Sequence, residues 1–242
     1  MELLDGKTVR DLAIASPAAA RIFEKFGIDY CCREEKSLAQ ACATAKVNLH
    51  EVVEALEKPF LSEIDRDWQS APLVELTRHI VEKHHQYLRQ EIPRLLALFA
   101  KVVLLHGHNH PELPEAERSF VALADELSPH LLREERMLFP YIEILEIAAK
   151  TGNPPAPPMF RTVRNPVHMM TMEHDSAGEL LHQIRQRAEG YRIPEDACMS
   201  LQILYRALRE FEADLHRHIH LENDILFPRA IALEEQVVGT SQ

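Results

Sequence analysis

The stretch HLLREERMLFP, residues 130–140, decides the fold, and it returns as HIHLENDILFP at residues 218–228. Both copies follow the pattern HxxxExxxLFP. In an α-helix, residues four apart lie on one face, about 6 Å apart along the axis, so each copy can direct an imidazole and a carboxylate toward one point. A single such pair is usually solvated, but two copies on facing helices predict a metal site.

The LFP end of each copy has a structural role of its own. Leucine and phenylalanine are expected to anchor the helix in apolar contacts. Pro140 and Pro228 lack an N–H group and are expected to kink or stop the helix. These contacts would fix the depth and rotation of the histidine and glutamate that precede them.

The composition indicates a soluble globular protein. Of the 242 residues, 46% are hydrophobic and 27% are charged, and the formal net charge of −11 argues against nucleic acid or an anionic membrane as a partner. The N-terminus lacks the apolar core of a signal peptide, and no run of about 18 apolar residues occurs. We therefore expect a cytoplasmic protein.

The four cysteines are Cys31, Cys32, Cys42 and Cys198. Two of them are neighbours, and a disulfide between neighbours strains the peptide that joins them, so this is a poor disulfide framework. We expect reduced thiols, as in a reducing compartment.

Only seven glycines and long stretches of Ala, Leu, Glu, Arg and Gln predict an all-α protein. Residues 1–57 are expected to form a small helical domain with the vicinal cysteines, with helices at 8–15, 17–26, 37–44 and 48–56. Residues 58–72 are expected to be a linker and 233–242 a tail. Between them, helices at 73–105, 114–149, 166–189 and 194–232 predict an up-down-up-down four-helix bundle, an architecture that forms metal sites from inward-facing side chains.

The other two helices are expected to complete the metal site. His174 precedes His218 by nearly the same distance as His85 precedes His130, so the bundle reads as a duplicated helix pair. His84 competes with His85, because neighbours on a helix diverge by about 100° and only one can point inward. The helical face around His85 is wholly apolar, whereas that around His84 includes Glu91, which favours His85.

The predicted ligands are His85, His130, Glu134, His174, His218 and Glu222. A structural zinc site is a closed tetrahedron, usually with cysteine, whereas imidazoles with bridging carboxylates suit two iron ions held close together. His106, His108 and His110 lie in a polar connection and are expected to be exposed. His168, His182, His216 and His220 lie away from the ligand line and are expected to contact solvent or pair with acids.

Several motifs occur in the order found in one family: DYCC, HHxYLRxEIPRL, HxxxEExxLFP, MxxEHDxAGELL and HxxLENDxLFPRA. The bundle resembles the hemerythrin-like HHE domain. With its N-terminal segment, nearly the whole chain resembles the di-iron RIC proteins, which repair iron centres and include the ScdA/YtfE type. One departure is that Arg33 and Glu34 follow the cysteine pair, where the family commonly has glycines.

The resemblance implies a non-haem di-iron centre with Glu134 and Glu222 bridging two iron ions. It also implies the repair of iron–sulfur proteins damaged by nitric oxide or peroxide during stress, with damaged cluster proteins as partners. Some members are associated with nitric oxide reduction. A homodimer is compatible with the sequence.

Oxygen-carrying hemerythrins use five histidines, so a site with four has a further coordination position for water, nitric oxide or dioxygen. Cys31 and Cys32 are then candidate catalytic thiols, as soft auxiliary ligands or electron donors. Three alternatives remain at this point. The thiols are merely packed; the protein is a non-enzymatic nitric oxide or oxygen sensor or carrier; or the chain is a structural helical bundle that happens to be rich in histidine.

Overall fold

The computed structural model describes residues 8–15, 17–28, 30, 36–57, 67–193, 195 and 197–239. These residues form helices and their connections, and Thr8 and Ser37 make an isolated β-bridge. The predicted all-α fold is confirmed. Cys31 and Cys32 lie outside the described residues.

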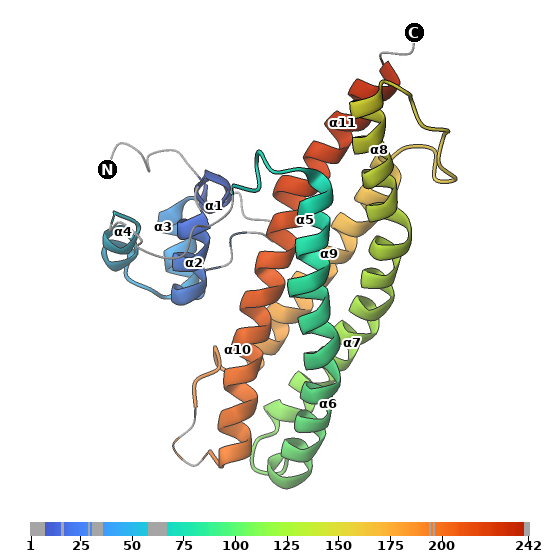
Figure 1. Ribbon diagram of the computed structural model, residues 1–242. Helices are drawn as coiled ribbons and strands as arrows, with labels where there is room; N and C mark the ends of the chain where they lie inside the picture. The colour runs from blue at the N-terminus through green and yellow to red at the C-terminus, as the bar shows by residue number, and fades with distance from the viewer. Residues whose placement is uncertain are drawn as a thin grey trace.

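Four short helices precede the bundle and lie beside its last helix (Figure 1). Ser37 starts the third with a capping box, in which its side chain accepts from the Gln40 N–H and the Gln40 side chain accepts from the Ser37 N–H. Gly27, with φ of +65°, ends the second, because a left-handed residue after a helix favours glycine. The four are α1 (Val9–Ala15), α2 (Pro17–Phe26), α3 (Leu38–Ala45) and α4 (Leu49–Glu57).

Four long helical rods form the bundle, running alternately up and down (Figure 1). The first rod comprises α5 (Leu73–Ile80), η1 (Val81–His85) and α6 (Gln86–His106); the second α7 (Glu112–Arg133), η2 (Glu134–Leu138) and α8 (Phe139–Thr151); the third α9 (Arg164–Arg187); and the fourth α10 (Met199–His220), η3 (Leu221–Leu226) and α11 (Phe227–Gly239). This architecture agrees with the predicted up-down-up-down bundle.

Three of the rods contain a π-helical segment, which the sequence analysis did not anticipate. The segments η1, η2 and η3 lie at mid-length and carry His85, Glu134 and Glu222. Pro140 and Pro228 follow η2 and η3 as the second residues of α8 and α11, in a first helical turn where a missing N–H is tolerated. The prolines therefore do not stop the helices, because the wider π turn before each one absorbs the break.

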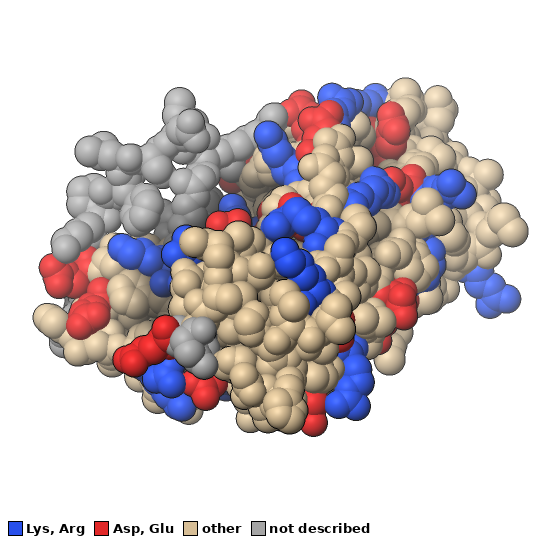
Figure 2. Space-filling view, turned by 90° about the horizontal axis from the view of Figure 1, so that it is seen from below, with Lys and Arg blue, Asp and Glu red and all other residues tan. Residues whose placement is uncertain are grey.

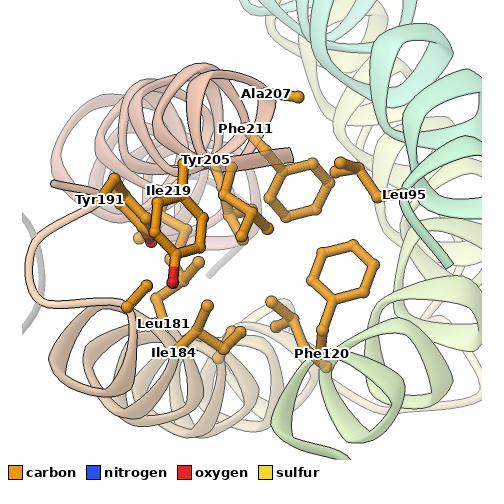
Figure 3. Packing of buried hydrophobic residues seen from close by; sticks show 14 of the residues in the cluster. Leu95, Phe120, Leu181, Ile184, Tyr191, Tyr205, Ala207, Phe211 and Ile219 are labelled. Carbon is orange, nitrogen blue, oxygen red and sulfur yellow. The ribbon is translucent and has the colours of Figure 1, made fainter. Parts of the chain in front are cut away.

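The bundle interior is apolar on both sides of the level at which the π segments lie. One cluster joins the lower half to the N-terminal helices, and Figure 3 shows part of it, where Phe120 and Phe211 meet edge to face with centroids 5.4 Å apart. A second cluster fills the upper half around Leu76, Leu138 and Leu226. Polar side chains at the middle level are therefore enclosed by apolar layers above and below.

The fourth rod continues to Gly239, through residues that the sequence analysis assigned to a tail. The buried Glu234 explains the extension. Its carboxylate accepts hydrogen bonds from the Tyr141 hydroxyl at 2.8 Å, from the Val163 N–H at 2.9 Å and from the Thr162 hydroxyl. These bonds hold the end of α11 against α8 and the start of α9.

Part of the expected linker is also fixed to the bundle. Arg229 on α11 donates to the carbonyl oxygens of Trp68 at 2.6 Å and Ala71 at 2.7 Å. Figure 2 shows Lys and Arg side chains interspersed with Asp and Glu on the described part of one face of the molecule.

Within the described residues, no helix combines the length and the apolar character that a membrane span requires.

Candidate metal centre

The six residues singled out by the repeat meet in the middle of the bundle. They come from all four rods: His85 from η1, His130 and Glu134 from α7 and η2, His174 from α9, and His218 and Glu222 from α10 and η3. Each is at most 2% exposed. Side chains far apart in the sequence thus converge at one enclosed point.

The converging atoms form two groups that share both glutamates. His85 and His218 make one group with Glu134 and Glu222, and His130 and His174 make the other with the same two carboxylates. The Nε2 atoms of His85 and His218 lie 3.2 Å apart, and those of His130 and His174 lie 3.0 Å apart. Each group could hold a cation, and the two groups share both carboxylates.

The carboxylate oxygens lie close to all four imidazoles. Glu134 Oε2 is 3.5 Å from His85 Nε2 and 3.4 Å from His130 Nε2. Glu222 turns Oε1 toward His218 at 3.1 Å and Oε2 toward His174 at 3.3 Å. Metal–ligand bonds of about 2.1 Å put neighbouring ligand atoms roughly 3.0–3.4 Å apart, so these separations suit ligands of a common ion.

The phenylalanine of each LFP copy fixes one imidazole. Phe139 stacks on His85 with centroids 5.7 Å apart and an interplanar angle of 24°. Phe227 stacks on His174 at 5.9 Å and 3°. The LFP motif therefore positions the histidine contributed by a different rod, in addition to anchoring its own helix.

Three of the imidazoles are also held from outside the centre. His85 Nδ1–H donates to Glu135 at 2.6 Å, His130 Nδ1–H to Glu173 at 2.7 Å, and His174 Nδ1–H to the Asn223 side-chain oxygen at 2.9 Å. Arg89 and Arg133 in turn bind the two carboxylates. An acceptor at Nδ1 fixes the tautomer that leaves the Nε2 lone pair free for a cation.

The site holds two buried carboxylates at close range. Burial and the Glu222 carboxylate raise the pKa of Glu134, but His130 and His85 outweigh both and hold it below its usual value. Burial raises the pKa of Glu222 as well, yet His218 and His174 bring it well below the ordinary range. Both groups therefore stay ionised.

The histidines respond to the same charges. Burial lowers the pKa of His130, but Glu134 and Glu222 outweigh burial and raise it to about 9. Burial also lowers the pKa of His85, which the contacts with Glu134 and Glu222 reverse. For His218, burial prevails and its pKa falls.

The oxygens of Glu134 and Glu222 are buried, and although imidazole nitrogens lie 3.1–3.5 Å away, no described residue meets them with hydrogen-bond geometry. Buried ionised oxygens without donors are costly, and a bound cation removes that cost. Two histidines with shared carboxylates at each position are also a donor set that suits non-haem ferrous iron and leaves positions open for a small ligand. The residues present therefore fit metal ions.

The other histidines lie outside the centre. His84 is buried, as is His85, but its ring is parallel to that of His218 at 5.7 Å and its Nδ1 binds Asp214 at 3.1 Å. His220 pairs with an acid, Asp224, at 2.8 Å. His216 is 6% exposed, so the expected solvent contact is nearly absent, and its ring lies 6.4 Å from that of Tyr30.

The remaining predicted positions are more simply placed. His168 and His182 are exposed on α9, and His106, His108 and His110 lie at or after the end of α6. Cys42 is buried, and burial raises its pKa. Sequence reasoning missed Glu135, Glu173 and Asn223, although each adjoins a predicted ligand in the sequence.

Comparison with protein families gives two matches along the chain. Residues 76–230 match the hemerythrin HHE cation binding domain, and residues 5–59 match the ScdA N-terminal domain, a domain of unknown function. The first match contains all six residues of the candidate centre.

Curated proteins similar to the chain include the iron-sulfur cluster repair protein YtfE of Escherichia coli, 36% identical over 93% of this chain and 96% of the relative. The protein of the same name from Escherichia fergusonii is 35% identical over the same shares. The similarity spans both matched regions.

Proposed function

Because this chain belongs to the hemerythrin HHE cation binding domain family, together with the iron-sulfur cluster repair proteins YtfE, we propose that it binds two iron ions and repairs damaged iron–sulfur clusters. The proposal depends on one observation: two groups of candidate metal ligands share Glu134 and Glu222. His85 and His218 would hold one ion and His130 and His174 the other, and both positions would share Glu134 and Glu222.

Iron would supply Lewis acidity and a reversible change of oxidation state at this centre. The chain does the rest: Glu135, Glu173 and Asn223 keep three Nε2 atoms directed inward, and the apolar layers exclude bulk water. Four protein donors at each position leave room for a small ligand such as nitric oxide, or for transfer of an ion to a cluster that has lost one.

We also propose that residues 1–57 form a domain attached by residues 58–72 to the metal-binding bundle, whose rods run from Leu73 to Gly239, and that Cys31 and Cys32 act on the centre or its cargo. Tyr30, which immediately precedes Cys31, contacts His220 with ring centroids 5.4 Å apart. His220 lies two residues from His218. These contacts place Tyr30 against the fourth rod near the level of the centre, on a face of the helix about 200° from that of His218.

The proposal is tested with an enzyme whose [4Fe–4S] cluster has been damaged by nitric oxide. Iron-loaded protein is added without oxygen, and both the recovered enzyme activity and the iron remaining on this chain are followed. We expect recovery above that given by an equal amount of free ferrous iron, with matching iron loss from the chain. Recovery equal to that with free iron would contradict the repair function.

Two variants separate the centre from the rest of the protein. Glu134→Ala removes a carboxylate that both positions share and is expected to abolish the excess recovery. Glu143→Ala replaces an exposed glutamate on the same rod and is expected to change nothing. Reversible nitric oxide binding without any recovery would instead favour a sensor or carrier.

A further inference from the structure

The duplication of the bundle makes the two halves of the centre directly comparable. The repeated phrase relates His130 and Glu134 to His218 and Glu222, and their spacing relates His85 to His174. The observed contacts follow this relation, because each glutamate lies near the histidine of its own helix and near the preceding histidine of its half. Equivalent positions are therefore expected to have equivalent surroundings.

The first pair of outer contacts obeys the relation. Glu135, which follows Glu134, accepts from His85 at 2.6 Å. Asn223, which follows Glu222, accepts from His174 at 2.9 Å. In both halves, the residue after the shared glutamate holds the preceding histidine.

The second pair of outer contacts does not follow the equivalence of the two halves. Glu173, which precedes His174, accepts from His130 at 2.7 Å. The equivalent residue, which precedes His85 and should accept from His218, is His84. Its ring instead lies parallel to that of His218, with centroids 5.7 Å apart and an interplanar angle of 1°, and its Nδ1 is bound to Asp214.

As a result, Nδ1 of His218 is buried with no hydrogen-bond partner among the described residues. An outer acceptor fixes the orientation of a ligand imidazole and raises its basicity. Loss of such an acceptor typically lowers the metal affinity about 10- to 100-fold. The His85–His218 position has one anchored imidazole, whereas the His130–His174 position has two.

We propose that the two iron positions are unequal, that the ion between His85 and His218 is the one the protein exchanges, and that His84 is the positioning residue responsible. This inference rests on the proposed dinuclear iron centre. It adds which ion leaves and which residue sets its lability.

The surroundings of His84 also suit the passage of a cation. Asp214 Oδ2 is buried and has no partner in the part of the chain that the structure describes, while the Asp214 side chain as a whole is 15% exposed. A chain of contacts therefore runs from His218 through His84 to the partly exposed Asp214. On the opposite side, the Glu173 carboxylate is already occupied by Arg133 at 2.5 Å.

The test measures iron release from the full chain loaded with two ferrous ions, using an excess of a ferrous chelator in the absence of oxygen. We expect two phases of one iron each, separated about 10- to 100-fold in rate. Release of both ions in one phase would overturn the inference.

Variants assign each phase to a position. Glu135→Leu frees His85 and is expected to speed only the fast phase, whereas Glu173→Leu frees His130 and is expected to speed only the slow phase. The reverse assignment would overturn the inference. Glu179→Leu, at an exposed site on the same helix as Glu173, is the matched control and should leave both phases unchanged.

Two variants at position 84 give His218 a hydrogen-bond acceptor like Glu173, which accepts from His130 in the other half. His84→Glu introduces the carboxylate found at position 173, and His84→Gln offers a neutral amide, as Asn223 does, if a buried charge prevents folding. Either is expected to slow the fast phase about tenfold or more and to leave the slow phase unchanged. If both fold and neither slows it, His84 does not set the lability.

Failure here is distinguishable from failure of the proposed function. A chain that binds fewer than two irons contradicts the dinuclear centre, and this is known before any chelator is added. Two irons that leave at one rate contradict only the inequality, while the repair assay tests the function independently.

Discussion

The Nε2 atoms of His130 on α7 and His174 on α9 lie 3.0 Å apart in the interior of the bundle. Both rings donate Nδ1–H to outer acceptors, Glu173 and Asn223, so both inner nitrogens are directed at the same point. The raised pKa of His130, about 9, lets a proton bridge them in the metal-free chain, whereas a cation bound to both nitrogens also satisfies the buried carboxylates of Glu134 and Glu222. The folded chain is therefore expected to be more stable with metal than without it.

Ferrous iron should raise the thermal midpoint of the metal-free protein. Binding to the folded state alone contributes about 2.7 kcal/mol when free metal is 100 times Kd. His174→Ala is expected to lose much of this gain. Circular dichroism melting without oxygen, with and without iron, measures the effect.

His168→Ala is the matched control, because His168 lies on the same helix but is exposed. It should keep the full gain. A His174→Ala protein that is stabilised by iron as strongly as the unaltered chain would contradict the placement of His174 at the cation.

The repeat and the helical faces were enough to predict the four rods and the six converging side chains. Helical periodicity places residues four apart on one face, which brought His130 with Glu134 and His218 with Glu222. An apolar face distinguished His85 from its neighbour His84. These are local properties of a helix, so one sequence is sufficient to read them.

The outer hydrogen-bond partners of the ligands and the π segments depend on contacts between rods. Glu173 and His84 occupy equivalent positions in the two halves, yet one accepts a hydrogen bond from a ligand imidazole and the other stacks on one. Nothing in the helical period distinguishes these outcomes. The helical period does not predict the π segments either, because they depend on how each rod adjusts around the enclosed polar centre.

Glu234→Ala should lower the free energy of unfolding by about 2–3 kcal/mol, because two buried donors and the half-buried Thr162 hydroxyl lose their acceptor. Its neighbour Glu235 is exposed and pairs with the exposed Arg164, so Glu235→Ala should cost about 0.5 kcal/mol or less. Urea unfolding of the two variants measures both. Equal losses would show that the Glu234 contacts contribute little.

Asp224→Ala should also destabilise the fold, since its buried carboxylate accepts from Arg10 of α1 at 2.6 Å and from His220 at 2.8 Å. We expect a loss of about 2 kcal/mol in urea unfolding. Asp125→Ala, at an exposed site, should stay within about 0.5 kcal/mol. An Asp224→Ala protein as stable as this control would argue against docking through Arg10.

Cys31→Ser and Cys32→Ser are expected to keep the iron content and to lower the recovery of the damaged enzyme, because the thiols are proposed to act on the ion and not to hold it in the bundle. Cys198→Ser, at a half-buried thiol before α10, is the control and should change neither quantity. Full recovery with both serine variants would show that Cys31 and Cys32 take no part in repair.

The central claim, two irons bridged by Glu134 and Glu222, is tested most directly by iron content per chain after anaerobic loading. We expect about two irons for the unaltered protein and for Glu143→Ala, about one for His85→Ala, which affects a single position, and almost none for Glu222→Ala, which affects both. Two irons retained by Glu222→Ala, or a single iron in the unaltered chain, would contradict the shared-carboxylate centre.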